Sequence, residues 1–325
     1  MKSSKEYFLG ATGIRVAPIG LGTWQFAGGH RGISGWYWPD MADETVYQIV
    51  KKALDAGVNW FDTAECYGNG RSERLLASAL KKCHVKNGDV VIVTKWWPLL
   101  RTADSIRQTI DERLRALDGF GIDLYLVHQP LSLSSVKAQM DAMSDLVEQG
   151  KVRSIGVSNF NADFMRRAHK ALQARGLSLA VNQVKYNLFD RSIETNGILE
   201  SARASGTSII AWSPLDQGML TGRFHEDPSS MKRLSWARRK MYGFTDAKLN
   251  KTRPLIEALK RIAREHGGTV SQVALSWLIQ FNGGAVVTVV GASKPAHIED
   301  NAEALRFVLS AGEINEIDAL SREFK

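Results

Sequence analysis

Eight short runs rich in β-branched residues recur along this chain of 325 residues, and amphipathic stretches separate them. Such alternation predicts parallel strands, because each helix returns the chain to the edge where the next strand begins. The predicted strands span residues 17–22, 58–61, 90–94, 122–127, 154–157, 180–182, 208–211 and 286–290. The predicted helices span residues 43–56, 72–82, 102–117, 134–149, 162–175, 193–205, 253–266 and 295–305. Eight successive strand and helix units predict a closed (β/α)8 barrel, the TIM barrel fold of the α/β class.

A barrel of this kind also accounts for the length of the chain. α/β barrels routinely use about 250 residues or more for a single domain. No linker or low-complexity segment interrupts the alternation, so we expect one domain over residues 1–325.

Two features lie outside the repeating units. Ahead of the first strand, residues 7–9 and 14–16 flank the turn-rich tetrapeptide 10–13 (GATG), which predicts an N-terminal β-hairpin that could close the bottom of the barrel. The connections 28–41 and 213–251 are much longer than the others. Long connections in a compact domain are usually functional, so we expect binding loops or lids at the C-terminal face of the barrel.

The cysteine content and the absence of a secretion signal both indicate a cytoplasmic protein. Cys66 and Cys83 are the only cysteines, too few for a disulfide framework or a thiolate zinc site. Residues 1–13 contain no apolar run long enough for a signal peptide. The uncharged stretch 267–293 is interrupted by paired glycines, so we interpret it as a core helix and a strand, with no membrane span.

The chain is basic, with 42 Lys and Arg against 34 Asp and Glu and a formal net charge of +8. Most of the excess is scattered in pairs, and the densest patch is formed by Lys232, Arg233, Arg238, Arg239 and Lys240. This patch is either a solvated surface or a site for a phosphate-bearing ligand. Nucleic-acid binding is a weaker alternative that would require affinity at physiological salt. We expect no nucleic-acid or membrane partner.

Polar residues follow the predicted strands at the point where each strand ends. Asp62, Lys95 and His128 follow three successive strands at intervals of 33 residues. Ser158-Asn159, Gln183 and Trp212-Ser213 occupy the corresponding positions of the next three strands. Each residue alone has a structural alternative, such as an ion pair, a hydrogen-bonded histidine or a backbone cap. Their shared position favours one active site, because barrel enzymes build it at the C-terminal ends of the strands.

Tyr67 completes this set of candidate catalytic residues. It lies five residues after Asp62, in a loop that Gly68 and Gly70 allow to turn tightly. A tyrosine has an ordinary pKa of about 10, and a buried ammonium such as that of Lys95 would lower it while Asp62 keeps the ammonium in place. The sequence lacks the GxGxxG, P-loop, HExxH and GxSxG motifs. Asp62, Tyr67 and Lys95 could therefore supply a proton donor of adjusted pKa, on the same rim as His128.

The segment 57–73, GVNWFDTAECYGNGRSE, resembles the signature of the aldo-keto reductases. The resemblance extends through GLGTW at 20–24, GVSNF at 156–160 and AWSPL at 211–215, and so covers nearly the whole chain. It implies hydride transfer between NADP(H) or NAD(H) and a carbonyl or alcohol, with no metal and with Asp62, Tyr67, Lys95 and His128 as the catalytic residues. Tyr67 would be the general acid, Lys95 would lower its pKa, and Asp62 would anchor Lys95. His128 would orient the carbonyl oxygen.

The resemblance also implies where the cofactor binds. Ser158, Asn159 and Gln183 would hold its carboxamide, and Trp212 would stack on the nicotinamide ring. The segment after the seventh strand would follow the pyrophosphate through Ser213, Pro214, Leu215, Gly218 and Arg223. Further cofactor contacts are expected at Thr23, Trp24, Gly291, Ser293, Lys294, His297, Asp300 and Asn301.

We expect NADP(H) to be preferred, with NAD(H) possible, because Ser293, Lys294 and His297 could bind a 2′-phosphate at the start of the helix that opens near Pro295. Many family members carry a Lys-Ser pair after the eighth strand. This chain has GASK at 291–294 instead, closer to the bacterial and potassium-channel β-subunit branches.

An apolar substrate pocket is expected from the aromatic residues Trp24, Trp36, Trp38, Trp96 and Trp97, although one or two of them could simply pack a loop. The leading interpretation is a carbonyl reductase or alcohol dehydrogenase of broad specificity. The alternative is a cofactor-binding regulatory subunit that senses redox state with little turnover. The sequence favours no particular substrate, reaction direction or oligomeric state.

Overall fold

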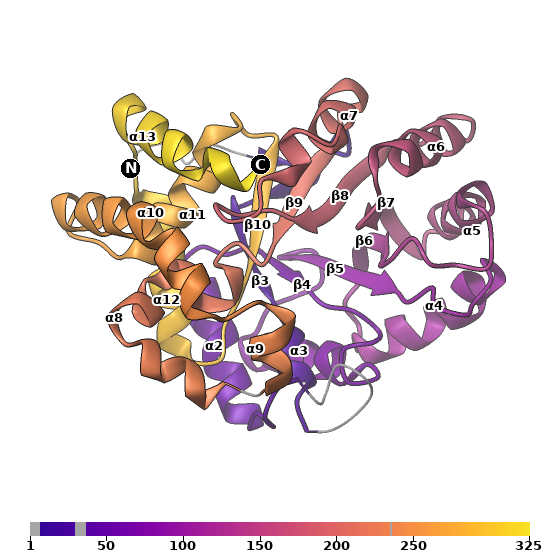
Figure 1. Ribbon diagram of the computed structural model, residues 1–325. Coiled ribbons are helices and arrows are strands. Elements are labelled where there is room, and N and C mark those ends of the chain that lie inside the picture. Colours follow the sequence, from indigo (N-terminus) through magenta and orange to yellow (C-terminus); the bar gives the residue numbers. More distant parts are fainter. Residues whose placement is uncertain (1–6, 30–36, 235) are drawn as a thin grey trace.

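A closed barrel of eight parallel strands forms the centre of the computed structural model, which describes residues 7–29, 37–234 and 236–325 (Figure 1). The strands run around the barrel in the order β10-β3-β4-β5-β6-β7-β8-β9. They are β3 (Ile19–Gly22), β4 (Trp60–Asp62), β5 (Val91–Trp96), β6 (Ile122–Val127), β7 (Val152–Ser158), β8 (Leu179–Lys185), β9 (Ser208–Trp212) and β10 (Val286–Gly291). The predicted TIM barrel is confirmed, and each predicted strand corresponds to one observed strand.

A ring of helices surrounds these strands. It consists of α2 (Asp43–Asp55), α3 (Arg71–Lys82), α4 (Asp104–Ala116), α5 (Val136–Glu148), α6 (Ala162–Gln173), α7 (Ile198–Ser205), α11 (Val270–Phe281) and α12 (Pro295–Glu303). Contacts between α12 and α2 close the ring. The helix predicted over 193–205 is shorter than expected, because residues Ser192–Glu194 form a separate 3₁₀ turn and Gly197 adopts a φ of 84° before α7 begins.

The seventh helix of the ring differs from the sequence prediction. Residues 253–266 were expected to fill this place, but they belong to α10 (Asp246–Glu265), which packs outside α11. α11 packs directly on β10, and it is apolar on nearly every side, so it is buried between the barrel and α10. α10 also begins earlier than predicted. Thr245 caps it, whereas Pro254, which suggests a helix start, lies inside it.

The N-terminal hairpin is confirmed and covers the bottom of the barrel. β1 (Tyr7–Phe8) pairs with β2 (Arg15–Val16), and Leu9 and Ile14 pack into the apolar interior of the barrel. The backbone N–H of Gly10 donates to Ser208 Oγ at 2.9 Å. A Cβ at Gly10 would lie 2.6 Å from the carbonyl oxygen of Ala180, so only glycine allows the turn to sit this close to β8.

The chain after β9 is folded into short helices rather than an open loop. It contains η3 (Asp216–Thr221), α8 (Arg223–Glu226), η4 (Pro228–Arg233) and α9 (Trp236–Met241). A small apolar cluster, which includes Met219, Phe224, Met231 and Phe244, holds these turns together. The other long connection, 28–41, lies partly outside the described residues. Among the described helices, none is long and apolar enough to cross a membrane.

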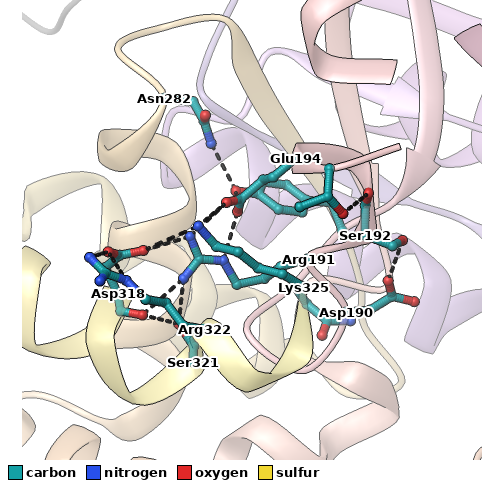
Figure 2. Close-up of polar contacts among 12 residues, drawn as sticks. Asp190, Arg191, Ser192, Glu194, Asn282, Asp318, Ser321, Arg322 and Lys325 are labelled. Carbon is teal, nitrogen blue, oxygen red and sulfur yellow. Dashed lines mark hydrogen bonds and ion pairs between the residues drawn. The ribbon is translucent and has the colours of Figure 1, made fainter. Parts of the chain in front are cut away.

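The C-terminal helix α13 (Ala311–Ser321) was not predicted, although Ser310 and Glu313 form a capping box that signals its start. A buried charge network attaches this helix to the loop after β8 (Figure 2). Arg191 has no exposed side-chain surface, and its guanidinium binds Glu194 and Asp318, each at 2.7 Å. The turns η5 (Ala304–Arg306) and η6 (Arg322–Phe324) flank α13.

Candidate active site

A cavity of about 440 Å³ lies at the C-terminal ends of the strands, within the usual size range of small-molecule sites. Strand ends from β3, β4, β7, β8, β9 and β10 contribute to its wall, and loops supply the rest. The lining residues are Gly22, Trp24, Gln25, Tyr37, Asp62, Cys66, Tyr67, Asn69, Trp97, His128, Gln129, Ser158, Asn159, Gln183, Trp212, Ser213, Pro214, Gln217, Tyr242, Val289 and Gly291.

A buried ion pair lies at the floor of this cavity. Lys95 Nζ donates to Asp62 Oδ1 at 2.6 Å and to the carbonyl oxygen of Thr63 at 2.8 Å. The second carboxylate oxygen of Asp62 accepts from Gln183 Nε2 at 2.8 Å. Because the Lys95 side chain is fully buried, this pairing is what allows a charged ammonium to remain in the barrel interior.

Tyr67 lies beside this pair, with its ring centroid 5.0 Å from Lys95 Nζ. The sequence predicts that the pKa of Tyr67 is lowered, whereas in the structure it is raised. Burial raises the pKa of Tyr67 well above its ordinary value, and the negative charge of Asp62 raises it further. The ammonium of Lys95, which is paired with Asp62, does not outweigh these effects. The phenol is therefore held in its protonated form.

His128 faces Tyr67 across the same end of the cavity. Their ring centroids are 5.7 Å apart in an edge-to-face arrangement, and the ring of Trp97 packs against the histidine at 5.2 Å in a similar way. Burial lowers the pKa of His128 well below its ordinary value, and the charge of Lys95 lowers it further. The imidazole is therefore neutral near pH 7. Its Nδ1 lies 3.4 Å from the sulfur of Cys66.

A chain of hydrogen bonds fixes the aromatic wall opposite these residues. Trp212 Nε1 donates to Asn159 Oδ1 at 3.1 Å, and Asn159 Nδ2 donates to Ser158 Oγ at 3.0 Å. Ser158 Oγ in turn donates to the carbonyl oxygen of Gln183 at 2.9 Å. These bonds connect the ends of β7, β8 and β9, so the indole of Trp212 is held as a flat surface against the cavity.

The chain beside this aromatic wall contains residues in strained backbone conformations. Four non-glycine residues in the segments that follow β7 and β9 have positive φ angles: Asn159 at 60°, Ser213 at 56°, Asp216 at 43° and Gln217 at 57°. Such conformations cost about 1 to 3 kcal/mol each and persist only where surrounding contacts impose them. Asn187 Nδ2 provides one such contact by donating to the carbonyl oxygen of Ser213 at 2.9 Å. Strain of this kind clusters at binding sites.

A group of basic side chains lies at the N-terminus of α12. Burial lowers the pKa of His297, and the nearby charges of Lys294 and Arg223 lower it further. Ser293 Oγ lies 3.3 Å from His297 Nδ1. Within the described part of the chain, neither Lys294 nor Arg223 pairs with a carboxylate. Uncompensated cations beside the positive end of a helix dipole form a favourable site for an anion.

Several predicted site residues occupy other positions. Trp96 does not belong to the substrate pocket, because it is fully buried in the core and its Nε1 donates to Ser105 Oγ at 3.0 Å. Trp38 packs edge-on against Trp24, with centroids 5.5 Å apart, and does not line the cavity. Trp36 lies outside the described residues.

The predicted cofactor contacts that lie outside the cavity wall are Thr23, Leu215, Gly218, Arg223, Ser293, Lys294, His297, Asp300 and Asn301. Thr23 is buried, and its hydroxyl donates to the carbonyl oxygen of Asp62 at 3.0 Å. Leu215 packs against the core. The carboxylate of Asp300 accepts from Gln272 Nε2 at 2.7 Å at the start of α11. Among the described residues, no group of three or more His, Cys, Asp or Glu side chains is placed to hold a metal ion.

The sequence analysis also missed a buried charge network behind the catalytic loop. Glu65, which precedes Cys66 and Tyr67, accepts from Arg101 Nη1 at 2.5 Å and from the backbone N–H of Trp97. Arg113 approaches the same carboxylate at 3.6 Å. The network joins the loop after β4, which carries Tyr67, to the loop after β5. A glutamate within the segment 57–73 was the only sequence signal for it.

The barrel and the site at its C-terminal face define a TIM-barrel oxidoreductase. A family model described as "Aldo/keto reductase family" matches residues 18–322, so the chain belongs to the aldo-keto reductases. Members of this family act on carbonyl compounds with nicotinamide cofactors, usually NADP(H).

Relatives match over nearly the whole chain. An uncharacterized oxidoreductase of Mycobacterium tuberculosis is 33% identical over 98% of this chain and 94% of its own length. The chloroplastic pyridoxal reductase of Arabidopsis thaliana is 32% identical over 95% of this chain and 84% of its own length. The crystal structure of a thermostable aldo-keto reductase in complex with the inhibitor epalrestat has a TM-score of 0.78 and 30% identity, covering 97% of this chain and 99% of that structure.

Proposed function

We propose that this protein, as a single domain over residues 1–325, is an NADP(H)-dependent reductase that converts aldehydes or ketones to alcohols, or catalyses the reverse reaction, with Tyr67 as the proton donor. One observation carries the proposal. The Asp62–Lys95 ion pair at 2.6 Å, the phenol of Tyr67 and the imidazole of His128 meet at one end of a single cavity. The sequence places these residues on three different βα units.

Proton transfer follows from the environment of Tyr67. Burial keeps the phenol protonated, so it is ready to give its proton to a carbonyl oxygen. As the proton leaves, negative charge develops on the phenol oxygen beside the ammonium of Lys95. A fixed cation in a water-poor site stabilises such developing charge more strongly than it would in water. Asp62 keeps Lys95 in this position. Neutral His128 donates a hydrogen bond to the same carbonyl oxygen.

The residues around the cavity fit a nicotinamide dinucleotide. When bound, the nicotinamide supplies or accepts the hydride. Ser158, Asn159 and Gln183 would hold its carboxamide, and the fixed indole of Trp212 would present a flat surface to the ring. The strained segment after β9, with Ser213, Pro214, Leu215 and Gly218, would follow the pyrophosphate. Trp24 and Gly291 border the same cavity, and Asn301 would contact the adenine.

The preference for NADP(H) rests on the basic group at α12. Lys294, Arg223 and His297 gather where a 2′-phosphate would add about two negative charges, and Ser293 adds a hydroxyl donor. The carboxylate of Asp300, in the same helix, is bound to Gln272 and Thr269. It is therefore directed toward α11, where these donors offset part of its charge.

The Tyr67→Phe variant tests the catalytic assignment. Carbonyl reduction, followed by nicotinamide absorbance over a panel of aldehydes, ketones and sugars, should fall by about 10²- to 10⁴-fold, while the cofactor dissociation constant stays nearly unchanged. Tyr125→Phe is the matched control, because Tyr125 is fully buried in the core, does not line the cavity, and its hydroxyl has no hydrogen-bond partner. A Tyr67→Phe variant that kept more than about a tenth of the rate, with chemistry limiting, would contradict the assignment.

Dissociation constants for NADP⁺ and NAD⁺ at several salt concentrations test the cofactor preference. NADP⁺ should bind more tightly, and the preference should weaken in Lys294→Ala. Lys86→Ala is the control, because Lys86 is exposed in the connection before β5, at the opposite end of the barrel. Equal affinities for the two cofactors would refute the preference.

A second candidate function is a cofactor-binding regulatory subunit. It is favoured by a putative voltage-gated potassium channel β-subunit of Schizosaccharomyces pombe, which is 30% identical over 93% of this chain and 88% of its own length. Tight cofactor binding with very slow turnover of every carbonyl tried would select this candidate over the reductase.

A further inference from the structure

Cys66 occupies a position beside the catalytic residues that the reaction described above does not use. It lines the cavity, and its sulfur lies 3.4 Å from Nδ1 of His128. The segment around it is firmly held. The backbone N–H of Glu65 donates to the carbonyl oxygen of Lys95 at 3.3 Å, and that of Tyr67 donates to the carbonyl oxygen of Ala64 at 3.1 Å. The thiol is therefore fixed opposite one particular nitrogen of the imidazole.

The orientation of the imidazole is fixed from other sides as well. The rings of Tyr67 and Trp97 pack edge-to-face against it. Asn159 Nδ2 donates to the backbone carbonyl of His128 at 3.2 Å, and the backbone N–H of His128 donates to the carbonyl oxygen of Trp96 at 3.0 Å. The ring is thus confined while Nδ1 faces the sulfur.

A neutral imidazole carries one proton, on either Nδ1 or Nε2, and the hydrogen bond made by one nitrogen determines which tautomer forms. Burial raises the pKa of Cys66 to about 12, so the sulfur is a protonated thiol near pH 7. An imidazole nitrogen accepts a hydrogen bond better than a thiol sulfur does, so the thiol is the donor in this contact. Nδ1 then has no proton, and the proton must be on Nε2.

We propose that Cys66 is a positioning residue that donates its S–H to Nδ1 of His128 and thereby holds the imidazole in the Nε2–H tautomer. This inference rests on the proposed function, because the tautomer affects the reaction only if His128 binds the carbonyl oxygen of a substrate. Nε2–H can donate to the carbonyl oxygen that receives the proton of Tyr67. In the opposite tautomer, the lone pair of Nε2 would face that oxygen and repel it.

The tautomer itself is measured by NMR of the protein labelled with ¹⁵N at histidine. In the wild type, Nδ1 of His128 should show the chemical shift of an unprotonated nitrogen and Nε2 that of a protonated one. Cys66→Ala should shift both signals toward the average of a mixed population, and Cys66→Ser should retain the wild-type pattern because a hydroxyl also donates. An unchanged pattern in Cys66→Ala would overturn the proposal, whatever the activity of the protein.

Kinetics provide the second readout. Losing one neutral hydrogen bond should lower kcat/KM of Cys66→Ala by about threefold to tenfold, with the cofactor dissociation constant unchanged, and Cys66→Ser should restore most of it. Cys83→Ala is the control, because it is the other free cysteine and lies at the end of α3. A Cys66→Ser variant as impaired as Cys66→Ala would overturn the proposal. Failure of the proposed function is distinct, since wild-type protein would then reduce no carbonyl while the tautomer measurement still stands.

Discussion

Replacing Arg191 by methionine should destabilise the whole domain, because this residue joins the C-terminal helix to the loop after β8 (Figure 2). Its side chain is fully buried and makes two hydrogen bonds to Glu194, at 2.7 and 2.8 Å. It also donates to the carboxylate of Asp318 and to Ser321 Oγ, both at 2.7 Å, and to the carbonyl oxygen of Asp318 at 3.2 Å. The guanidinium also lies 4.7 Å above the ring of Trp277. Methionine keeps the apolar stem and removes the charge.

The expected loss follows from the carboxylates that remain. Removing one partner of a buried ion pair typically costs about 3 to 5 kcal/mol, since it leaves an uncompensated charge. Here Glu194 keeps Lys325 at 3.0 Å, and Asp318 keeps Arg322 at 2.6 Å. We therefore expect about 3 kcal/mol, the lower end of that range. Neutralising both carboxylates in the same variant, with Glu194→Gln and Asp318→Asn, should recover much of the loss.

Urea unfolding followed by far-UV circular dichroism measures the loss, which should appear as a fall of about 1 M in the midpoint. Arg322→Met is the matched control, because Arg322 binds the same Asp318 but is 64% exposed, and exposed pairs contribute at most about 1 kcal/mol. The reasoning is refuted if Arg191→Met costs no more than Arg322→Met.

The pH dependence gives a further check on the same variant. Burial opposes ionisation of Glu194 and Asp318, but their hydrogen bonds, with Arg191 prominent among the donors, lower both pKa values below the ordinary range. Carboxyls with lowered pKa values stabilise the folded state above their unfolded pKa of about 4, and this contribution is lost as the pH falls through the folded value. The difference between wild type and Arg191→Met should therefore shrink as the pH falls below about 4.

Three further variants test the site. Lys95→Met should lower the rate of carbonyl reduction by about 10²- to 10⁴-fold. It should also raise the pH at which Tyr67 deprotonates in a spectroscopic titration. A near-normal rate would contradict the role of Lys95 in proton transfer. Trp212→Ala should weaken cofactor binding by about 0.5 to 1.5 kcal/mol in a fluorescence titration, and an unchanged affinity would make Trp212 a packing residue. Glu65→Gln should leave Arg101 without its buried carboxylate partner and lower the free energy of unfolding by about 1 to 3 kcal/mol, measured by thermal or urea unfolding. Unchanged stability would show that this network contributes little to the stability of the fold.

The sequence determined the barrel and the rim of the site because both follow from local patterns. Alternating strands and helices admit few topologies, and a closed parallel barrel brings the C-terminal ends of all strands to one face. The 33-residue spacing of Asp62, Lys95 and His128 therefore implied that they share that face, before any contact was known. The alternation of side chains along β5 could also have shown that Trp96 points away from the interior that Lys95 occupies.

Only the tertiary structure decided which of two neighbouring helices packs on β10. α11 takes this place rather than α10, because α11 is apolar enough to be covered on both sides. It also determined the pKa of Tyr67. The sequence supplies a lysine that would lower that pKa, but the folded chain pairs the lysine with Asp62 and removes the phenol from water. Burial and charge compensation depend on residues that are distant in sequence, such as Gln183 on Asp62 and Asp318 on Arg191. Local sequence patterns do not specify these tertiary contacts, because the contacts form only when the barrel closes.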